Sequence, residues 1–143
     1  MDEELWKTIR GYEGLYEVSN QGRVRSINRT ITNCRGRTQS FRGTILKPEN
    51  VFDGYERVCL CRNGGQKHHR VATLVYEAFN APIPKGFEID HINGIRTDNH
   101  LENLRAVSHL DNCHNPISRE RHLAANESRS RKMKEYWAQK KQK

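Results

Sequence analysis

The sequence predicts an α+β protein, in which a small antiparallel β module precedes a strand–turn–helix core and a basic C-terminal helix. Residues 4–61 consist of short β-branched and aromatic runs bounded by Gly, Asn, Asp or Pro, a pattern typical of strands. Apolar residues change to a helical period over residues 70–79. From about residue 117 to residue 140 the sequence is polar and basic, which predicts one long exposed helix.

The N-terminal module is expected to contain short strands joined by turns. SNQGR and RNGGQ supply turn chemistry, and the second is a strong hairpin signal. Residues 28–42 are basic and predict a mobile loop. The expected strands are LYEVS (15–19), RVRSI (23–27), TILKP (44–48) and YERVCLC (55–61).

The core begins with a helix that has one apolar face. That face holds positions i, i+3, i+4, i+7 and i+8 of the run, namely Val71, Leu74, Val75, Ala78 and Phe79. The segment APIPKG ends this helix. We expect a short strand at residues 87–92 and a hairpin-type turn at Asn-Gly 93–94. Ser108 is placed to cap a further helix that starts near His109.

Length and hydropathy favour one compact domain with an appendage and a small core. The chain has 143 residues, 34% of them hydrophobic, and a mean hydropathy of −0.95. It contains no apolar run of about 18 residues, so we expect no membrane span. The N-terminus lacks the apolar segment of a secretory signal, so the expected location is cytoplasmic.

The net charge of +8 is unevenly distributed. Residues 1–50 hold nine Lys and Arg against six Asp and Glu, and residues 116–143 hold nine against three. Residues 51–115 hold seven against eight, a net of −1. Basic flanks suit a polyanion such as nucleic acid. A slightly acidic middle suits a cation site placed against that polyanion.

The cysteines do not predict a metal site. Cys34, Cys59, Cys61 and Cys113 form no C-x-x-C pair, and we expect them to be reduced in the cytosol. Cys59 and Cys61 alternate along one strand face, so a zinc site is possible, but the spacings disfavour it. Small buried apolar side chains are the expected role.

The segment FEIDHINGIRTDNHLENLRAVSHLDN carries the candidate chemistry. Asp90 and His91 end the expected strand, and their side chains point to opposite sides of it. Asn112 lies on the helix that follows. Carboxylate and amide oxygens suit Mg²⁺ or Mn²⁺ rather than zinc. His91 can accept a proton from water at neutral pH, and Asn103 can either orient His91 or brace the turn.

These residues and their spacing resemble the HNH, or ββα-metal, nuclease motif of phage intron-encoded homing endonucleases. The matching elements are Asp90–His91, then Asn103–Leu104, then Asn112. Residues 5–27 are similar to the N-terminal strand module that accompanies this nuclease, and VATLVYEAF resembles the helix before the motif. The resemblance implies a DNA-binding module at 1–65, a ββα-metal nuclease core at 66–115 and a basic helical tail at 116–143.

The resemblance also implies a site and a reaction. Asp90 and Asn112 would bind one divalent metal ion, Mg²⁺ or Mn²⁺, while His91 acts as general base and Asn103 holds His91 in place. A monomer would nick one strand of double-stranded DNA and leave a 5′-phosphate and a 3′-hydroxyl, whereas a double-strand break would need a dimer or two events. The host would be a bacterial or phage-infected cell. A non-catalytic DNA-binding protein derived from such a nuclease is the alternative.

Two departures from the family pattern affect the prediction. The third position is Asn112 instead of His, and His114 two residues later faces another direction on a helix. Relatives often carry a C-terminal helix-turn-helix reader, whereas this sequence has one basic helix, so recognition of a long site is not expected.

Several other polar and aromatic residues have less specific expected roles. His68 and His69 are expected to contact phosphate or solvent, His100 to face solvent, and His109 and Asp111 to lie on a helix surface. Tyr12 and Tyr16 are expected in the module's core. The candidate DNA-binding residues are Arg23, Arg25, Arg35, Arg37, Arg42, Arg105, Arg129, Arg131, Lys132 and Lys134.

Overall fold

The N-terminal half consists of small antiparallel sheets. The computed structural model describes residues 3–140, apart from the side chains of Ser118, Arg121, His122, Ala125, Trp137 and Lys140. The first sheet contains β1 (Trp6–Thr8), β2 (Tyr16–Ser19) and β3 (Val24–Ser26). The second contains β6 (Glu49–Asn50), β7 (Glu56–Arg62) and β8 (Gly65–Arg70). The predicted β7–β8 hairpin is confirmed, and its turn uses positive φ at Asn63 (51°) and Gly64 (79°).

The segment predicted as a loop at residues 28–42 is instead a hairpin. β4 (Arg29–Thr32) pairs with β5 (Thr38–Phe41), and Oδ1 of Asn33 accepts hydrogen bonds from the backbone N–H groups of Arg35 and Arg37 across the turn. The segment folds as a hairpin because Asn33 supplies a turn and β-branched residues flank it. The expected strand at residues 44–48 is reduced to a bridge between Arg25 and Ile45.

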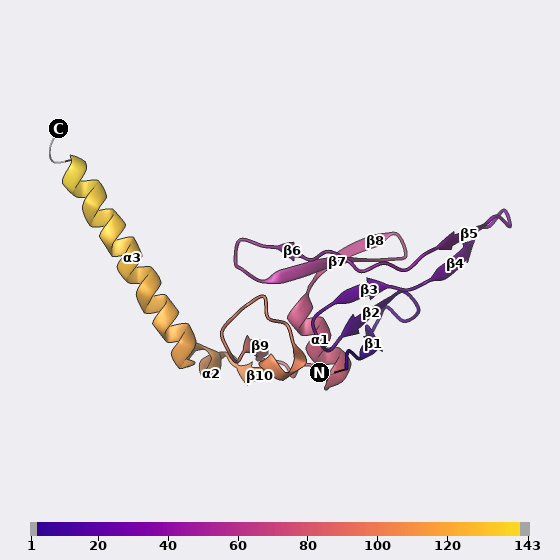
Figure 1. Ribbon diagram of the computed structural model, residues 1–143, viewed down its shortest axis with the longest axis horizontal. Helices are drawn as coiled ribbons and strands as arrows, with labels where there is room; N and C mark the ends of the chain where they lie inside the picture. Colours follow the sequence, from indigo (N-terminus) through magenta and orange to yellow (C-terminus); the bar gives the residue numbers. More distant parts are fainter. Residues whose placement is uncertain (1–2, 141–143) are drawn as a thin grey trace.

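The core lies where α1 (Val71–Phe79) meets the strands on either side of it (Figure 1). Val71, Leu74 and Val75 are buried, as the helical period predicts, and they pack with residues of β2 and β7. Val18 of β2 and Leu60 of β7 are fully buried. Burying one such side chain contributes about 1.5–3 kcal/mol, so this small cluster fixes the β module against the second half of the chain.

The second half contains a strand pair followed by two helices. β9 (Phe87–His91) pairs with β10 (Leu104–Ser108), which places Asp90 opposite Arg105. The connection is not a tight hairpin, because residues 92–103 intervene and end in the 3₁₀ turn η1 (Leu101–Asn103). The predicted cap is confirmed: the Ser108 hydroxyl accepts a hydrogen bond from the backbone N–H of Asp111 at the start of α2 (His109–Cys113).

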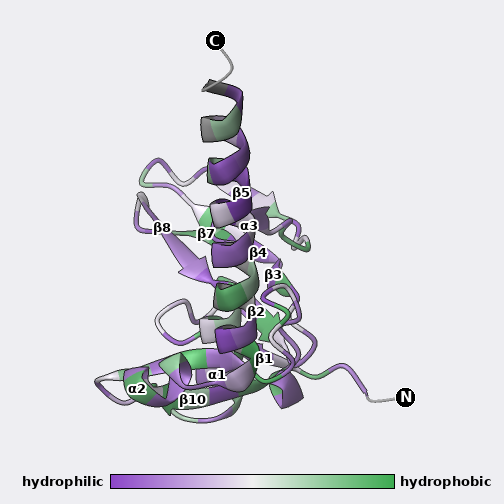
Figure 2. Ribbon diagram, turned by 90° about the vertical axis from the view of Figure 1, so that its left-hand side faces the viewer, coloured by the Kyte–Doolittle hydropathy of each residue, from purple (hydrophilic) through white to green (hydrophobic). Residues whose placement is uncertain are grey.

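α3 (Pro116–Lys140) is the long helix predicted near the C-terminus. It projects from the body on the side opposite the β4–β5 hairpin (Figure 1). Hydrophilic colours dominate its ribbon (Figure 2), and all of its described side chains are exposed. None of the described helices is long and apolar enough to cross a membrane.

Candidate active site

Asp90 and His91 end β9 and are both buried. Their exposed fractions are 7% and 3%. They are consecutive in a strand, so their side chains leave on opposite faces. Polar groups that are buried need partners, and the partners of these two residues define two separate networks.

The Asp90 carboxylate is held by cationic and amide donors. Its Oδ2 accepts hydrogen bonds from Nε and Nη2 of Arg105 at 3.0 and 2.8 Å, and from Nδ2 of Asn115 at 2.9 Å. Arg105 is therefore bound to the predicted metal ligand, where the sequence suggested a contact with phosphate. Asn115 is buried, and the sequence analysis missed it. The charge-assisted bonds satisfy Oδ2 and orient the carboxylate.

Asn112 lies on the same side of β9 as Asp90. Its Nδ2 donates to Oε2 of Glu88 at 3.0 Å, and Glu88 precedes Asp90 by two residues along the strand. His109 also binds Glu88, with Nδ1 2.9 Å from Oε1. The bond from Asn112, followed by that from His109, lowers the pKa of Glu88 below its ordinary value of 4.5. Because Nδ2 donates to Glu88, Oδ1 is the atom through which Asn112 can accept a hydrogen bond or bind a cation.

The donor set on this side fits a hard cation. Asp90 offers a carboxylate and Asn112 an amide oxygen, which are ligands that Mg²⁺ uses together with water and phosphate. Within residues 3–140, no group of three or more His, Cys, Asp or Glu could hold a metal ion. A site built from these residues would therefore need water or a substrate phosphate to complete its coordination.

His91 is bound on the opposite face by a residue that the sequence analysis did not select. Its Nε2 lies 3.1 Å from Oδ1 of Asn99, and Nδ2 of Asn99 donates to Oε2 of Glu56 at 2.7 Å. An ionised carboxylate only accepts, so Glu56 fixes the orientation of the Asn99 amide. Asn99 then presents an acceptor to His91, and Nε2 must carry the hydrogen. In the neutral imidazole, Nδ1 is therefore the proton-accepting atom.

Asn103 braces the loop that carries Asn99. Its Oδ1 accepts from the backbone N–H of Asn93 at 2.9 Å, and its Nδ2 donates to Oδ1 of Asn93 and to the carbonyl oxygen of Asp98. Of the two roles considered for Asn103, these contacts match the brace. Its side chain acts on His91 through the loop conformation. His100 binds Asp98 at 2.7 Å, and this bond is the main cause of the lowered pKa of Asp98.

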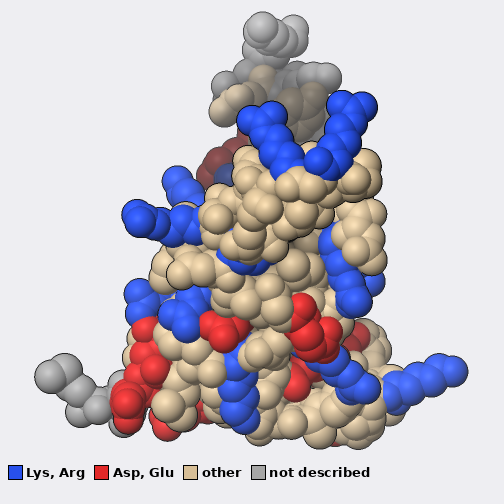
Figure 3. All heavy atoms as spheres, turned by 90° about the vertical axis from the view of Figure 1, so that its right-hand side faces the viewer, with Lys and Arg blue, Asp and Glu red and all other residues tan. Residues whose placement is uncertain are grey.

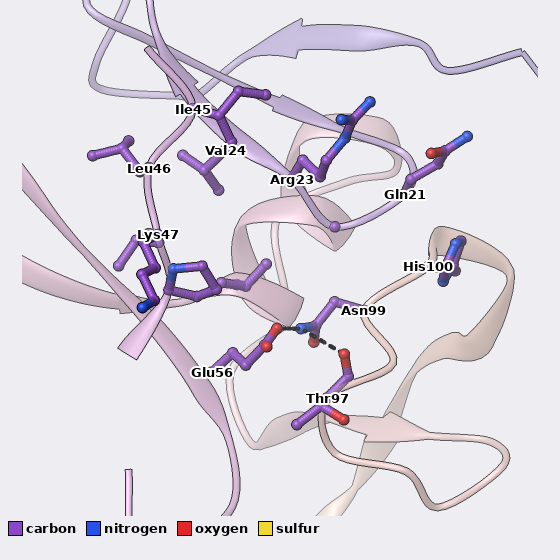
Figure 4. Close-up of a pocket in the computed structure, with 14 residues that line it drawn as sticks. Gln21, Arg23, Val24, Ile45, Leu46, Lys47, Glu56, Thr97, Asn99 and His100 are labelled. Carbon is purple, nitrogen blue, oxygen red and sulfur yellow. Dashed lines mark hydrogen bonds between the residues drawn. The ribbon is translucent and has the colours of Figure 1, made fainter. Parts of the chain in front are cut away.

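The N-terminal module packs directly against this loop. A Cβ on Gly22 would lie 2.8 Å from Cβ of Asn99, so only glycine permits this approach. The backbone N–H of Leu101 donates to the carbonyl oxygen of Asn20 at 2.8 Å. A pocket of about 450 Å³ lies between the two parts, with the bond from Asn99 to Glu56 on its wall (Figure 4).

The predicted DNA-binding residues fall into two groups. Arg23 and Arg25 are engaged within the module, where they pair with Glu4 and Glu17 and lie near the Trp6 ring. Apart from Arg105, which binds Asp90 from β10, the others are exposed on or next to the β4–β5 hairpin or on α3. Lys and Arg side chains project from the hairpin end of the molecule (Figure 3). This exposed group comprises Arg35, Arg37, Arg42, Arg129, Arg131, Lys132 and Lys134.

The structure also places the histidines and tyrosines considered above. Tyr16 is buried in the core, as predicted, and Tyr12 packs edge-on against it. His69 is partly buried: its Nε2 lies 3.0 Å from the Tyr12 hydroxyl, and this burial lowers its pKa. His68 is exposed beside Glu49, and Nδ1 of His114 binds the carbonyl oxygen of Leu110.

The expected burial of the cysteines is wrong for three of the four. Cys34, Cys61 and Cys113 are exposed, and Cys59 is partly buried. Desolvation and the neighbouring Cys61 raise the pKa of the Cys59 thiol. A raised pKa favours the protonated thiol over the thiolate that zinc binds.

The β9–β10 pair, the helix after it and the Asp–His pair at the strand end have the ββα arrangement of HNH nucleases. Comparison with known families agrees with this class: residues 67–114 match the HNH endonuclease family, and residues 4–61 match the NUMOD4 motif. The chain thus contains a segment that matches the HNH endonuclease family, and a NUMOD4 motif precedes that segment.

The chain is similar to phage proteins over much of its length. It is 37% identical over 114 residues to DNA endonuclease I-HmuI of Bacillus phage SP01, which covers 80% of this chain and 58% of that protein. A solved structure of the HNH homing endonuclease I-HmuI, which describes DNA binding and cleavage, matches with a TM-score of 0.64 and covers 81% of this chain and 59% of that one. Protein 3.8 of Escherichia phage T7 is 49% identical over 41 residues, or 29% of this chain and 34% of that protein. The chain thus spans less than two thirds of the length of these relatives.

Proposed function

We propose that the protein is a divalent-metal-dependent DNA endonuclease of the HNH homing type, which hydrolyses one phosphodiester of duplex DNA per site. The main support for this proposal is the arrangement at the end of β9. The oxygen ligands of Asp90 and Asn112 lie on one face of the strand, and the imidazole of His91 lies on the other. The similarity to I-HmuI, whose name and structure describe DNA cleavage, supports it. A cytoplasmic location and action as a monomer remain part of the proposal.

The residues have separate roles in this reaction. A Mg²⁺ or Mn²⁺ ion, when bound, supplies charge stabilisation for the phosphate and the leaving 3′ oxygen. Asp90 and Asn112 would hold that ion. His91 accepts the proton of the attacking water at Nδ1, because Asn99 binds Nε2. Arg105 binds Asp90, and if a cation took its place there, Arg105 would be free to contact a backbone phosphate.

A plasmid-relaxation assay tests the proposal. Purified protein with Mg²⁺ or Mn²⁺ should convert supercoiled plasmid to the nicked form, and His91→Ala should be severely slowed. Equal nicking by wild type and His91→Ala would refute the assignment, because the activity would then come from elsewhere. DNA binding without nicking by the wild type would instead support the non-catalytic alternative. End labelling should find a 5′-phosphate and a 3′-hydroxyl.

A further inference from the structure

Arginines from three segments cluster around one loop of the N-terminal module, beside His91. The loop joins β6 to β7 and includes Tyr55, whose ring centroid lies 5.8 Å from that of the His91 imidazole. The guanidinium groups of Arg70 and Arg96 lie 4.4 and 5.0 Å from the centroid of the same tyrosine ring. Arg70 ends β8 and Arg96 belongs to the loop after β9, so both halves of the chain supply the cluster.

Asp53 organises these arginines without neutralising them. Its Oδ2 lies 3.2 Å from Nη2 of Arg57 and 3.4 Å from Nη2 of Arg70, while its backbone oxygen accepts from Nη1 of Arg96 at 2.5 Å. The backbone N–H of Tyr55 and then the arginines lower the pKa of Asp53, so it is ionised at neutral pH. Three guanidinium charges thus surround one carboxylate, and the cluster keeps a net positive charge.

The tip of the loop adds a fully exposed aromatic side chain, Phe52. The loop that carries it is ordered: the backbone N–H of Gly54 donates to the oxygen of Val51 at 2.7 Å, and that of Val51 donates to the oxygen of Tyr55 at 3.2 Å. Guanidinium groups beside an exposed aromatic ring are the combination that binds a nucleic-acid backbone and its bases.

We propose that Arg57, Arg70 and Arg96 form a binding site for a DNA backbone phosphate that flanks the cleaved one, with Phe52 against the adjoining sugar or base. The site deepens the proposed function and rests on it for the position of that phosphate. Because the arginine site lies close to Tyr55 and His91, phosphate binding there would set the distance between the DNA and the His91 imidazole. None of these four residues was among the DNA-binding residues selected from the sequence.

The test measures binding separately from cleavage. Fluorescence anisotropy with a labelled duplex, in EDTA and across a NaCl series, gives the dissociation constant and its salt dependence without metal or chemistry. Arg96→Gln is the first variant, because this exposed side chain contributes nothing to the core. The triple variant Arg57→Gln, Arg70→Gln, Arg96→Gln is the second, with its fold checked by circular dichroism. Arg10→Gln is the matched control. Arg10 is exposed and lies near Arg62, which ends β7 away from the arginine cluster.

The expected result is a change in the salt slope. Losing one phosphate contact should reduce the slope of log K against log salt by about 0.9, so Arg96→Gln should lower it and Arg10→Gln should not. Equal slope changes in both variants would overturn the proposal, because net charge alone would explain them. A wild-type slope in the folded triple variant would also overturn it. Phe52→Ser should weaken binding while leaving the slope unchanged.

Cleavage then separates this proposal from the proposed function. If wild type nicks DNA and the arginine variants bind and nick as well as wild type, the phosphate site is wrong and the nuclease stands. If wild type does not nick, the proposed function fails, while the salt slopes still decide whether the arginines bind phosphate. Where nicking occurs, neutral methylphosphonates placed beside the mapped nick should weaken binding by wild type but not by the triple variant. Equal weakening of both proteins at every position would overturn the flanking location.

Discussion

Asp90 and His91 are neighbours in the sequence, but different parts of the chain hold them. Arg105 and Asn115, which bind Asp90, follow it by 15 and 25 residues in the sequence. His91 is held through Asn99 by Glu56, which belongs to β7 of the NUMOD4 segment. Gly22 packs against Asn99 from the same segment.

The N-terminal module thus has a structural role in the active site. The metal side of β9 is assembled from local residues, so a short HNH segment specifies it. The base side depends on a contact between residues 43 apart in sequence, from Glu56 to Asn99. The module therefore fixes the tautomer of the base in addition to any contact with DNA, and changes on the two sides should have different consequences.

The largest effects should come from Asp90 and His91 themselves. Asp90→Ala should abolish nicking and weaken Mn²⁺ binding, because it removes the carboxylate ligand. His91→Ala should slow the chemical step by about 10²–10⁴-fold, the usual contribution of a general base, while Mn²⁺ binding persists. Calorimetric titration of Mn²⁺ and single-turnover nicking measure the two properties. The same loss of metal affinity in both variants would contradict the division between the two sides.

The next largest effect should arise from Asn99. Asn99→Ala keeps the Cβ that packs on Gly22 but removes the acceptor for Nε2 of His91. We expect kcat to fall roughly tenfold to a hundredfold, the typical cost of losing an orienting partner. Because the loss falls on the orientation of the base, kcat should fall while KM stays near its wild-type value.

Glu56→Gln provides the comparison for Asn99→Ala. It removes the charge that fixes the Asn99 amide while leaving a side chain of similar size, so its effect on kcat should have the same direction and be smaller. Metal affinity should be unchanged in both variants. A fall in stability with a wild-type kcat would show that Glu56 and Asn99 only support folding. Thermal unfolding and single-turnover nicking together make that distinction.

On the metal side, Arg105 should compete with the cation for Asp90. Its guanidinium binds Oδ2 of Asp90, so Arg105→Gln should raise Mn²⁺ affinity in the absence of DNA. The side chain is 46% exposed, and solvent screening limits the expected gain to about threefold to tenfold. Arg105→Lys keeps the charge and is the control. Lower Mn²⁺ affinity in Arg105→Gln would mean that Arg105 orients Asp90 for the metal instead of competing with it.

The sequence predicted the local elements of this site well. The period of Val71, Leu74 and Val75 predicted α1, and Ser108 predicted the start of α2, because each signal lies within the element that it specifies. The hairpin at residues 29–41 was missed since its strands are exposed and carry no apolar alternation.

The network around His91 could not be predicted in the same way. Asn99 has no distinctive spacing within the loop, and Glu56 lies in a strand far from the motif. Only the packing of Gly22 and Asn20 on the loop brings these residues together. Asp90 and His91 were selected from their positions at a strand end, whereas their partners follow from tertiary contacts that a local pattern does not contain.

The smallest expected effect is a pH-dependent change in stability at Glu88. The bonds from Asn112 and His109 lower its folded-state pKa below the ordinary value of 4.5, so they stabilise the fold above about pH 4.5 and this contribution is lost as pH falls through the lowered pKa. Glu88→Gln removes the titrating group. Wild type should therefore melt slightly above Glu88→Gln at pH 7, and the difference should shrink as the pH is lowered below 4.5. Thermal unfolding followed by circular dichroism from pH 3 to pH 7 measures this difference. A gap in melting temperature that is constant across the series would mean that the Glu88 carboxylate contributes nothing through its charge, and that Asn112 is positioned by packing alone.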